Sequence, residues 1–196
     1  AKGTDWYKGT ANAIYQNISF IDSYDPEYVI ILSGDQICKQ DYADFLRFHK
    51  EKGAEFSVAV MEVDWKEASR FGLMVADEDD KITEFQEKPP VPKSNLASMG
   101  IYIFNWDVLK KYLEEDEADP NSKNDFGMNI IPALLRDGRK MYAYHFNGYW
   151  RDVGTIDSLW EANMEVLDPE NSGIDIFDEK WKIYSRNPVL PAQKIG

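Results

Sequence analysis

Short apolar runs alternate with amphipathic stretches in the first part of the chain. Residues 28–33 form a continuous apolar run that ends at Gly34, which is typical of a central strand buried on both faces of a parallel sheet. Asp41 is placed to cap a helix with a 3.6-residue apolar period, and Gly53 is placed to end it. A second apolar run over residues 56–61 completes a β-α-β pattern with a right-handed crossover, so the chain is predicted to have an α/β fold.

The rest of the pattern predicts a hairpin and a further series of strands and helices. Residues 71–75 and 81–85 flank an acidic turn, which favours two antiparallel strands. Thr10 is placed to cap an upstream helix. Later elements are expected as strands over residues 98–104 and 141–146, helices from Trp106 and from Asp125 with an interruption at Pro132, a polar loop over residues 114–123, and a last helix from Thr155 whose Ile156, Leu159, Trp160 and Leu167 face inward.

The composition is that of one globular domain with a substantial core. The chain has 196 residues, of which 43% are hydrophobic, and at this length about 70% of the surface is buried on folding. Its apolar runs are far shorter than the ~20 residues of a membrane helix. A net charge of −13 without a basic block disfavours polymeric nucleic acid as a partner. The single cysteine, Cys38, fits a reducing compartment, so we expect a cytoplasmic protein. Because the chain opens on Ala1 rather than Met, we also expect it to be a piece of a longer protein.

Two aspartates stand at the ends of predicted strands, where open α/β sheets bind their ligands. Asp35 directly follows the apolar run that ends at Gly34, and Asp152 precedes the helix that Thr155 caps. Two carboxylates from separate strand-to-helix junctions can hold one Mg²⁺, whose other positions go to water and phosphates. For each residue taken alone, a structural role is equally common: Asp35 can cap a turn, and Asp152 can bond to Arg151 or to backbone N–H groups.

An adjacent acid and base, Glu87 and Lys88, end the second strand of the predicted hairpin. Lys88 would suit a phosphate and Glu87 a pair of sugar hydroxyls, although an exposed ion pair is the favoured interpretation of the dipeptide alone. Ser98, Gly72 and Tyr7 are, by themselves, more often turn or core residues. The sequence has no Gly-x-Ser-x-Gly elbow and no Cys/His pair for a covalent nucleophile, and both histidines are interpreted as structural. It also has no Gly-x-Gly-x-x-Gly or Walker-type phosphate loop.

Six ordered segments carry a resemblance to one family. They lie at residues 6–17 (WYKGTANAIYQN), 32–42 (LSGDQICKQDY), 70–74 (RFGLM), 85–89 (FQEKP), 94–104 (SNLASMGIYIF) and 149–155 (YWRDVGT). Together these segments resemble the bacterial glucose-1-phosphate adenylyltransferases, also called ADP-glucose pyrophosphorylases. Residues 187–191 (NPVLP) resemble the lead-in to that family's C-terminal left-handed β-helix. Family members begin earlier, with a Gly-rich segment that binds ATP and pyrophosphate, and this segment is not in the chain.

The resemblance implies a Rossmann-like nucleotide-diphospho-sugar transferase fold, with a mixed, mostly parallel sheet flanked by helices. Residues 1–168 would form a partial catalytic domain, and residues 169–196 would form a linker to a left-handed β-helix domain that is missing from the chain. The full-length protein is expected to be a homotetramer or a hetero-oligomer. Without the ATP-binding segment, the chain alone is expected to be inactive.

The function implied by the resemblance is the synthesis of ADP-glucose and pyrophosphate from ATP and glucose 1-phosphate, a step of glycogen synthesis. Asp35 and Asp152 match the family's Mg²⁺ carboxylates, and Lys88 matches a residue that holds the attacking phosphate, so these three are the implied catalytic residues. The resemblance further implies contacts to glucose 1-phosphate from Tyr7, Gly72, Glu87, Lys88 and Ser98, a contribution of Tyr102 to the sugar pocket, and positions near the nucleotide for Trp6 and Gln16.

Three positions depart from the family pattern, since Asn12 stands where the family usually has Asp, Gln36 where it has His, and Cys38 where it has Tyr. These changes leave the implied metal carboxylates intact but affect the local packing and the nucleotide side. Two alternatives stay open, namely a non-catalytic regulatory subunit of the same family and a nucleotidyltransferase that uses another base or sugar. The presence of both aspartates weighs against the regulatory subunit.

Overall fold

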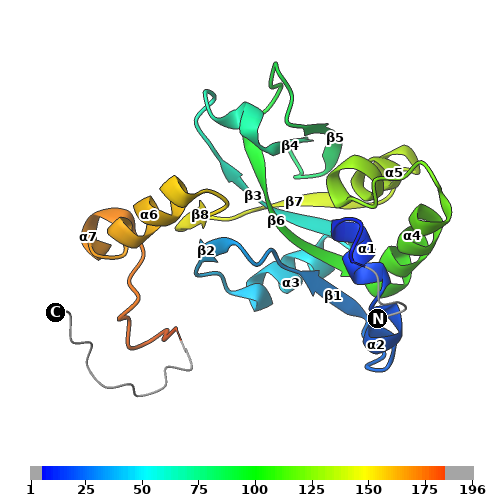
Figure 1. Cartoon of the computed structure of the whole chain (residues 1–196), viewed down its shortest axis with the longest axis horizontal. Helices are drawn as coiled ribbons and strands as arrows, with labels where there is room; N and C mark the ends of the chain where they lie inside the picture. The colour runs from blue at the N-terminus through cyan, green and yellow to red at the C-terminus, as the bar shows by residue number, and fades with distance from the viewer. Residues whose placement is uncertain (1–5, 184–196) are drawn as a thin grey trace. The chain divides into compact units, whose positions relative to one another are not determined.

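The computed structural model describes residues 6–183, which fall into two compact units (Figure 1). The larger unit comprises residues 6–34 together with Gln40–Asn147. The smaller unit comprises Asp35–Lys39 together with residues 148–183. Each unit therefore contains segments that are far apart in the sequence.

The larger unit is built on one six-stranded sheet in the order β5-β4-β6-β3-β7, with β1 also paired to β6. Its strands are β1 (Tyr28–Ile31), β3 (Phe56–Glu62), β4 (Gly72–Ala76), β5 (Ile82–Glu87), β6 (Leu96–Asn105) and β7 (Met141–His145). The predicted hairpin over the acidic turn is confirmed, because β4 and β5 pair antiparallel. The prediction of an α/β fold with a mixed sheet and flanking helices is confirmed as well.

The expectation of a mostly parallel sheet is wrong. Within the described residues, β3 and β7 are the parallel pair, and the other pairs of this sheet are antiparallel. The predicted β-α-β unit does contain two strands that run in the same direction, β1 and β3. They are not neighbours, however, because β6 lies between them and pairs antiparallel with both. The sequence pattern predicts that β1 and β3 pair directly with each other. In the structure β6, a strand from much later in the chain, lies between them.

A bulge at the middle of β6 interrupts its pairing with β3. Val58 of β3 faces Tyr102 and Val60 faces Ser98, so β6 carries two extra residues between these pairs. Gly100 lies in the bulge with a φ of 68°, a left-handed conformation that glycine adopts without a side-chain clash. Beyond the bulge, β6 pairs with β1, and before it β6 pairs with β4. The bulge also separates Ser98 from Tyr102, two of the predicted sugar-site residues.

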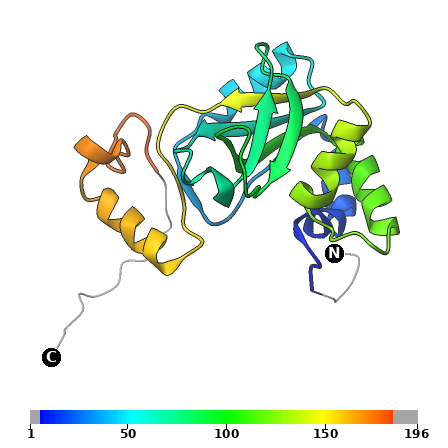
Figure 2. The same cartoon turned by 90° about the horizontal axis from the view of Figure 1, so that it is seen from above.

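Helices cover both faces of this sheet (Figures 1 and 2). They are α1 (Thr10–Tyr15), α2 (Ile18–Asp22), α3 (Tyr42–Glu51), the 3₁₀-helix Ala68–Arg70, α4 (Trp106–Ala118), the π-helix Phe126–Ile130 and α5 (Ile131–Arg136). Asp41 caps α3 as predicted, since its Oδ1 accepts from the Ala43 N–H at 2.8 Å. The polar loop predicted from residue 114 starts later, because α4 continues to Ala118.

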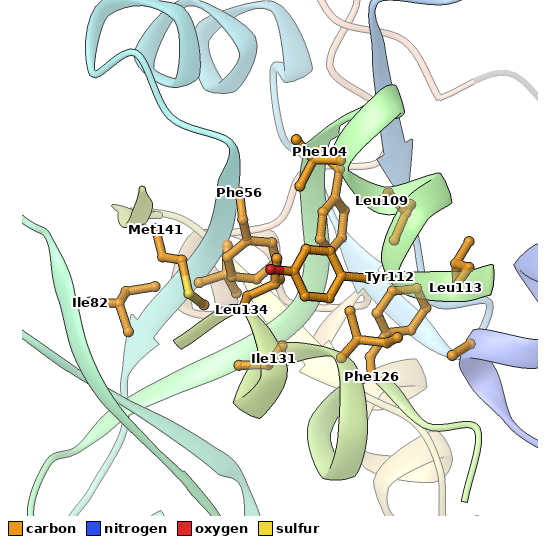
Figure 3. Packing of buried hydrophobic residues seen from close by; sticks show 14 of the residues in the cluster. Phe56, Ile82, Phe104, Leu109, Tyr112, Leu113, Phe126, Ile131, Leu134 and Met141 are labelled. Atoms are coloured by element: carbon orange, nitrogen blue, oxygen red, sulfur yellow. The ribbon is translucent and has the colours of Figure 1, made fainter. Parts of the chain in front are cut away.

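The core lies between the sheet and the helices α1, α4 and α5 (Figure 3). Phe56, Val58 and Val60 of β3 point into this cluster, which Tyr112 of α4 and Phe126 of the π-helix complete. Side chains alternate along a strand, so Ser57 points to the opposite face, where α3 packs. All of β3 up to Val60 is buried, which explains the apolar run at residues 56–61.

His49 of α3 links the helix to two central strands. Its ring is fully buried, with Nε2 2.9 Å from Asn105 Oδ1 and Nδ1 2.8 Å from Ser57 Oγ. Because the Asn105 carbonyl accepts from Nε2–H, Nδ1 of the neutral ring accepts from the Ser57 hydroxyl. Burial lowers the pKa of His49, a hydrogen bond to Asn105 opposes this shift, and the nearby Lys50 charge lowers the pKa further.

In the smaller unit, β2 (Gln36–Cys38) pairs antiparallel with β8 (Trp150–Asp152), followed by α6 (Ile156–Glu165) and α7 (Pro169–Ser172). Thr155 caps α6 as predicted, because its hydroxyl accepts from the Ser158 N–H at 3.1 Å and the Ser158 hydroxyl accepts from the Thr155 N–H at 3.2 Å. Within the described residues, none of the helices of either unit combines the length and apolarity needed to span a bilayer.

The predicted inward face of the last helix is wrong. In the structure, Ile156, Leu159, Trp160 and Leu167 are 86%, 47%, 63% and 76% exposed, and the buried residue of α6 is Ala162. A two-stranded ladder with three residues in each strand offers too little surface to cover an apolar helix face.

The residues after α7 extend the smaller unit. Lys39 Nζ lies 3.1 Å from Asp178 Oδ2 and 5.1 Å from the centre of the Trp181 ring. The division into a partial catalytic domain over residues 1–168 and a linker over residues 169–196 stays a prediction. The segment 187–191, whose sequence resembles the lead-in to a β-helix, lies outside the described residues.

Because of His49, we expect the protein to become less stable as the pH is lowered below about 6.5. Its pKa is lowered in the folded state, so below the ordinary histidine pKa of ~6.5 the unfolded chain binds a proton that the folded chain does not. The free energy of unfolding should then drop by up to about 1.4 kcal/mol per pH unit until the folded-state pKa is reached. Urea unfolding at pH 7.5, 6.5 and 5.5 measures this drop.

The matched variant is His49→Gln, which keeps hydrogen-bonding groups near Ser57 and Asn105 but cannot be protonated in this range. The unfolding free energy of this variant should not show the drop due to His49 between pH 6.5 and 5.5. An identical pH dependence in the variant and the original protein would contradict the assignment to His49.

Candidate functional site

The smaller unit brings the backbones of the two predicted metal-binding aspartates together. Asp152 ends β8 and faces Gln36 in the ladder, so its backbone lies next to that of Asp35, the residue before Gln36. The Asp35 carbonyl accepts a hydrogen bond from the Val153 N–H at 2.9 Å. Because Asp35 lies in the bend just before β2, the alternation of side chains along that strand does not apply to it.

A network of side chains holds β8 against α6. The Arg151 guanidinium bonds to the Glu165 carboxylate, and Arg151 Nη1 lies 3.5 Å from Glu161 Oε2. The Tyr149 hydroxyl donates to Glu165 Oε2 at 2.5 Å. These bonds involve the residues on both sides of Trp150 and leave Asp152 outside the network. Arg151 is therefore paired with α6 and not with Asp152. The other part of the sequence-based alternative, a bond from a backbone N–H group to Asp152, is the contact seen here, because the Gly154 N–H donates to Asp152 Oδ1.

The donor set at the end of β8 fits a hard divalent cation, since such ions prefer carboxylate oxygens. Asp152 Oδ1 accepts from the Gly154 N–H at 3.2 Å, which orients the carboxylate and leaves further lone pairs. Within residues 6–183, no group of three or more His, Cys, Asp or Glu side chains is arranged to hold a metal ion. A cation held by these two aspartates would therefore complete its shell with water or phosphate oxygens.

The larger unit gathers most of the predicted sugar-phosphate residues at the open end of the β4–β5 hairpin. Gly72 and Glu87 are direct partners in this antiparallel ladder. The side chain of Glu87 is 33% exposed, and its Oε1 lies 4.0 Å from Lys88 Nζ. Lys88 has a φ of 43° and its N–H donates to the Phe71 carbonyl at 3.2 Å, so the chain turns sharply after β5. Its side chain is 66% exposed, which leaves the ammonium group accessible to an anion.

Ser98 and Tyr102 of β6 belong to the same neighbourhood. Burial raises the pKa of Tyr102 to about 12, a hydrogen bond with Ser98 opposes the shift, and the charges of Asp125 and Glu87 raise it further. The Ser98 hydroxyl also accepts from the Gly100 N–H at 3.2 Å, inside the bulge of β6. The structure thus brings Gly72, Glu87, Lys88, Ser98 and Tyr102 to one region of the larger unit.

Asp125 belongs to this region, although the sequence pattern marked it only as a helix start. Its Oδ1 accepts from the Met128 N–H at 2.9 Å and caps the π-helix, and its Oδ2 accepts from the Thr10 hydroxyl at 3.0 Å. Burial raises the pKa of Glu87, the Lys88 charge opposes the shift, and the Asp125 charge adds to it. The region therefore combines two carboxylates and one ammonium group, a set suited to hydroxyl groups and an anion.

The segment around α1 holds the two residues implied for the nucleotide, Trp6 and Gln16, together with Tyr7, which the resemblance implies for glucose 1-phosphate. Trp6 and Tyr7 are 94% and 54% exposed, and the Tyr7 hydroxyl accepts from Asn17 Nδ2 at 3.2 Å. Gln16 is buried, its Nε2 donates to Asn12 Oδ1 at 2.9 Å, and its Oε1 has no hydrogen-bond partner among the described residues. Thr10 joins this segment to Asp125, and its hydroxyl also accepts from the Phe126 N–H at 3.1 Å.

Two of the positions that depart from the family pattern have matching partners. Asn12 is buried, its Nδ2 donates to Glu117 Oε2 at 2.8 Å, and its Oδ1 accepts from the Lys8 N–H at 3.1 Å. An aspartate at residue 12 would place a second carboxylate against Glu117 and lose the donor. In the smaller unit, Gln36 Oε1 accepts from Trp150 Nε1 at 3.2 Å. Both amides are therefore integrated into the packing around them.

The chain belongs to the nucleotidyl transferase family, whose family model matches residues 2–169. This assignment confirms the family-level resemblance seen in the six ordered segments.

Individual relatives extend the match over the whole chain. The chain is 68% identical over 195 residues to a glucose-1-phosphate adenylyltransferase of Clostridium beijerinckii, a match that covers 100% of the chain and 50% of the relative. Similar relatives of the same name come from Clostridium acetobutylicum, at 65% identity over 99% of the chain and 51% of the relative, and from Desulforamulus reducens, at 62% identity over 99% of the chain and 48% of the relative. The chain thus spans about half the length of the curated relatives it matches.

Proposed function

We propose that this chain is part of a glucose-1-phosphate adenylyltransferase, which forms ADP-glucose and pyrophosphate from ATP and glucose 1-phosphate for glycogen synthesis. The observation that carries the proposal is the identity of 62–68% over essentially the whole chain to relatives of that name. Two features of the structure also support the proposal. They are the adjacent backbones of Asp35 and Asp152 and the group of residues around Glu87 and Lys88.

The reaction needs no covalent protein intermediate. An oxygen of the sugar phosphate attacks the α-phosphorus of ATP in line, a new P–O bond forms, and the bond from the α-phosphorus to the departing pyrophosphate breaks. The protein contributes by positioning the reactants and stabilising charge. This requirement fits a chain in which the sequence offers no activated nucleophile.

The larger unit would bind glucose 1-phosphate. Glu87 would accept hydrogen bonds from sugar hydroxyls, because its carboxylate is partly exposed and its ion-pair partner among the described residues, Lys88 Nζ, lies 4.0 Å away. Lys88 would hold the attacking phosphate with its exposed ammonium group. Further contacts are proposed from Tyr7, Gly72, Ser98 and Tyr102, and Trp6 and Gln16 are proposed to lie near the nucleotide.

The smaller unit would hold Mg²⁺ through Asp35 and Asp152. When bound, such an ion neutralises charge on reacting phosphates and on a departing pyrophosphate. The two aspartates would keep this cation in place, and the hydrogen bond from the Gly154 N–H would hold the Asp152 carboxylate in orientation. A cation is also a way to bring anionic substrates to a chain with a net charge of −13.

The cytoplasmic location, the homotetrameric or hetero-oligomeric assembly and the inactivity of this chain alone stay predictions. Relatives that carry the enzyme's name favour a catalytic protein over a regulatory subunit.

A product assay of the full-length protein tests the proposed function. With glucose 1-phosphate and each of ATP, CTP, GTP and UTP, we expect ADP-glucose and pyrophosphate from ATP to be the main products. A preference for another nucleotide would identify a related transferase instead. Binding of glucose 1-phosphate without any turnover would support a regulatory subunit and contradict the proposal.

Replacing Asp35 by Asn in the full-length protein should lower kcat by about 100-fold or more, because the variant loses one of the two carboxylates proposed to hold the cation. The melting temperature should stay nearly unchanged, because Asn has almost the same shape. Steady-state kinetics with saturating Mg²⁺ and thermal unfolding measure the two quantities.

Asp157→Asn is the matched control, since Asp157 lies in the first turn of α6 in the same unit and has no proposed role in the reaction. This variant should keep its turnover. Comparable kcat values for Asp35→Asn and the original protein would remove Asp35 from the metal site.

A further inference from the structure

The Glu87 carboxylate lies against the backbones of two glycines from different elements. A Cβ atom added at Gly127 of the π-helix would lie 2.7 Å from Glu87 Oε2, and one added at Gly72 of β4 would lie 3.1 Å from the same oxygen. Contacts below 3.0 Å force an atom to move. The carboxylate therefore occupies space that a side chain at residue 127 would fill, and a side chain at residue 72 would crowd both the carboxylate and the Phe85 ring.

The conformation of Gly127 does not require glycine. The described glycines with positive φ are Gly53, Gly100, Gly138 and Gly173, and Gly127 is not among them. In a helical segment, glycine is less stable than alanine by about 0.5–1 kcal/mol. Alanine would thus suit the backbone at residue 127 better than glycine does, and the space beside Glu87 is the feature that alanine would remove.

Glu87 is the group that would move if residue 127 gained a side chain. The neighbouring carboxylate of Asp125 is held by hydrogen bonds from the Met128 N–H at 2.9 Å and from the Thr10 hydroxyl at 3.0 Å. Glu87 Oε2, in contrast, is the end of a flexible side chain, and the ion pair of Glu87 with Lys88 spans 4.0 Å. Displacing the Glu87 carboxylate would therefore disturb little of the fold.

We infer that Gly127 is a positioning residue, which leaves the space that fixes the Glu87 carboxylate for the hydroxyl groups of the sugar. The inference rests on the proposed function, because it assumes that Glu87 binds the sugar of glucose 1-phosphate. Gly127 itself would act through Glu87. Its effect should therefore appear in sugar-phosphate binding and be absent from the binding of the nucleotide.

Kinetics of Gly127→Ala in the full-length protein test this inference. The KM for glucose 1-phosphate should rise about tenfold or more, which corresponds to the loss of a hydrogen bond to a charged group. The KM for ATP should stay unchanged, and the melting temperature should stay the same or rise slightly. An unchanged KM for glucose 1-phosphate in this variant, or failure of the variant to fold, would overturn the inference.

A double variant separates an effect through Glu87 from a general disturbance. If Gly127 acts by placing the Glu87 carboxylate, Gly127→Ala combined with Glu87→Gln should raise the KM no further than Glu87→Gln alone. Additive effects would show that Gly127 acts independently of Glu87 and would reject the inference.

Gly138→Ala is the control for a glycine replacement that only affects stability. Gly138 has a φ of 67° and nothing within 4 Å of an added Cβ, so alanine there is strained but touches nothing near Glu87. This variant should have a lower melting temperature and an unchanged KM for glucose 1-phosphate. An increase in its KM would show that replacing a glycine away from Glu87 also raises this KM, and would overturn the inference.

Two further variants distinguish failure of the inference from failure of the proposed function. Glu87→Gln and Lys88→Ala should each raise the KM for glucose 1-phosphate. If they do so and Gly127→Ala does not, the inference alone is wrong. If neither raises this KM, the sugar-phosphate site of the proposed function is wrong and the inference falls with it.

Discussion

The backbone pairing of β2 with β8 is the constraint on which the proposed chemistry depends. These two strands of three residues come from distant parts of the chain, and their ladder sets Asp152 opposite Gln36, the residue that follows Asp35. No local signal brings the two aspartates together. The ladder is short, and it is supported by the bonds from Arg151 and Tyr149 to Glu165 of α6 and by the Thr155–Ser158 cap at the start of that helix. A cation site on this ladder would thus depend on the packing of α6, a helix for which no role in the reaction is proposed.

In the larger unit, β6 has the corresponding role for the sugar-phosphate residues. It lies between β3 on one side and β1 and β4 on the other, and the bulge at Gly100 lies between the part of β6 that pairs with β1 and the part that pairs with β4. The bulge sets the separation of Ser98 and Tyr102 on β6. The ladder of β4 with β5 places Glu87 opposite Gly72, and the Thr10–Asp125 bond joins α1 to the start of the π-helix. Residues that are scattered in the sequence therefore meet through backbone pairing and one side-chain contact.

The elements that the sequence predicts well are those with local causes. Asp41 caps α3, the acidic turn closes a hairpin, and Thr155 caps α6, because each depends on a few neighbouring residues. The prediction of a mostly parallel sheet was wrong because β6 lies between β1 and β3. This pairing joins distant parts of the chain, and no local sequence pattern indicates it. The prediction that the apolar face of α6 points inward was wrong. The spacing of apolar residues indicates an amphipathic helix, but it does not show whether another surface covers the apolar face.

The candidate site divides in the same way. Asp35, Asp152, Glu87 and Lys88 could be selected from their positions at strand ends, and the resemblance supplied the remaining residues. Asp125 was recognised only as a helix start because its capping bond to the Met128 N–H is local, whereas its proximity to Glu87 is not. The contact of Gly127 with Glu87 could not be predicted from the sequence, because a glycine in a helical pattern does not indicate which side chain packs against it.

Binding of Mn²⁺ to the full-length protein, without substrates, tests the central claim most directly. Mn²⁺ accepts the same oxygen ligands as Mg²⁺ and is observed by electron paramagnetic resonance. If one cation is shared by Asp35 and Asp152, removal of either carboxylate alone, in Asp35→Asn or in Asp152→Asn, should weaken binding of the same single ion by about tenfold or more. Two variants that each retain the original affinity would contradict the shared site.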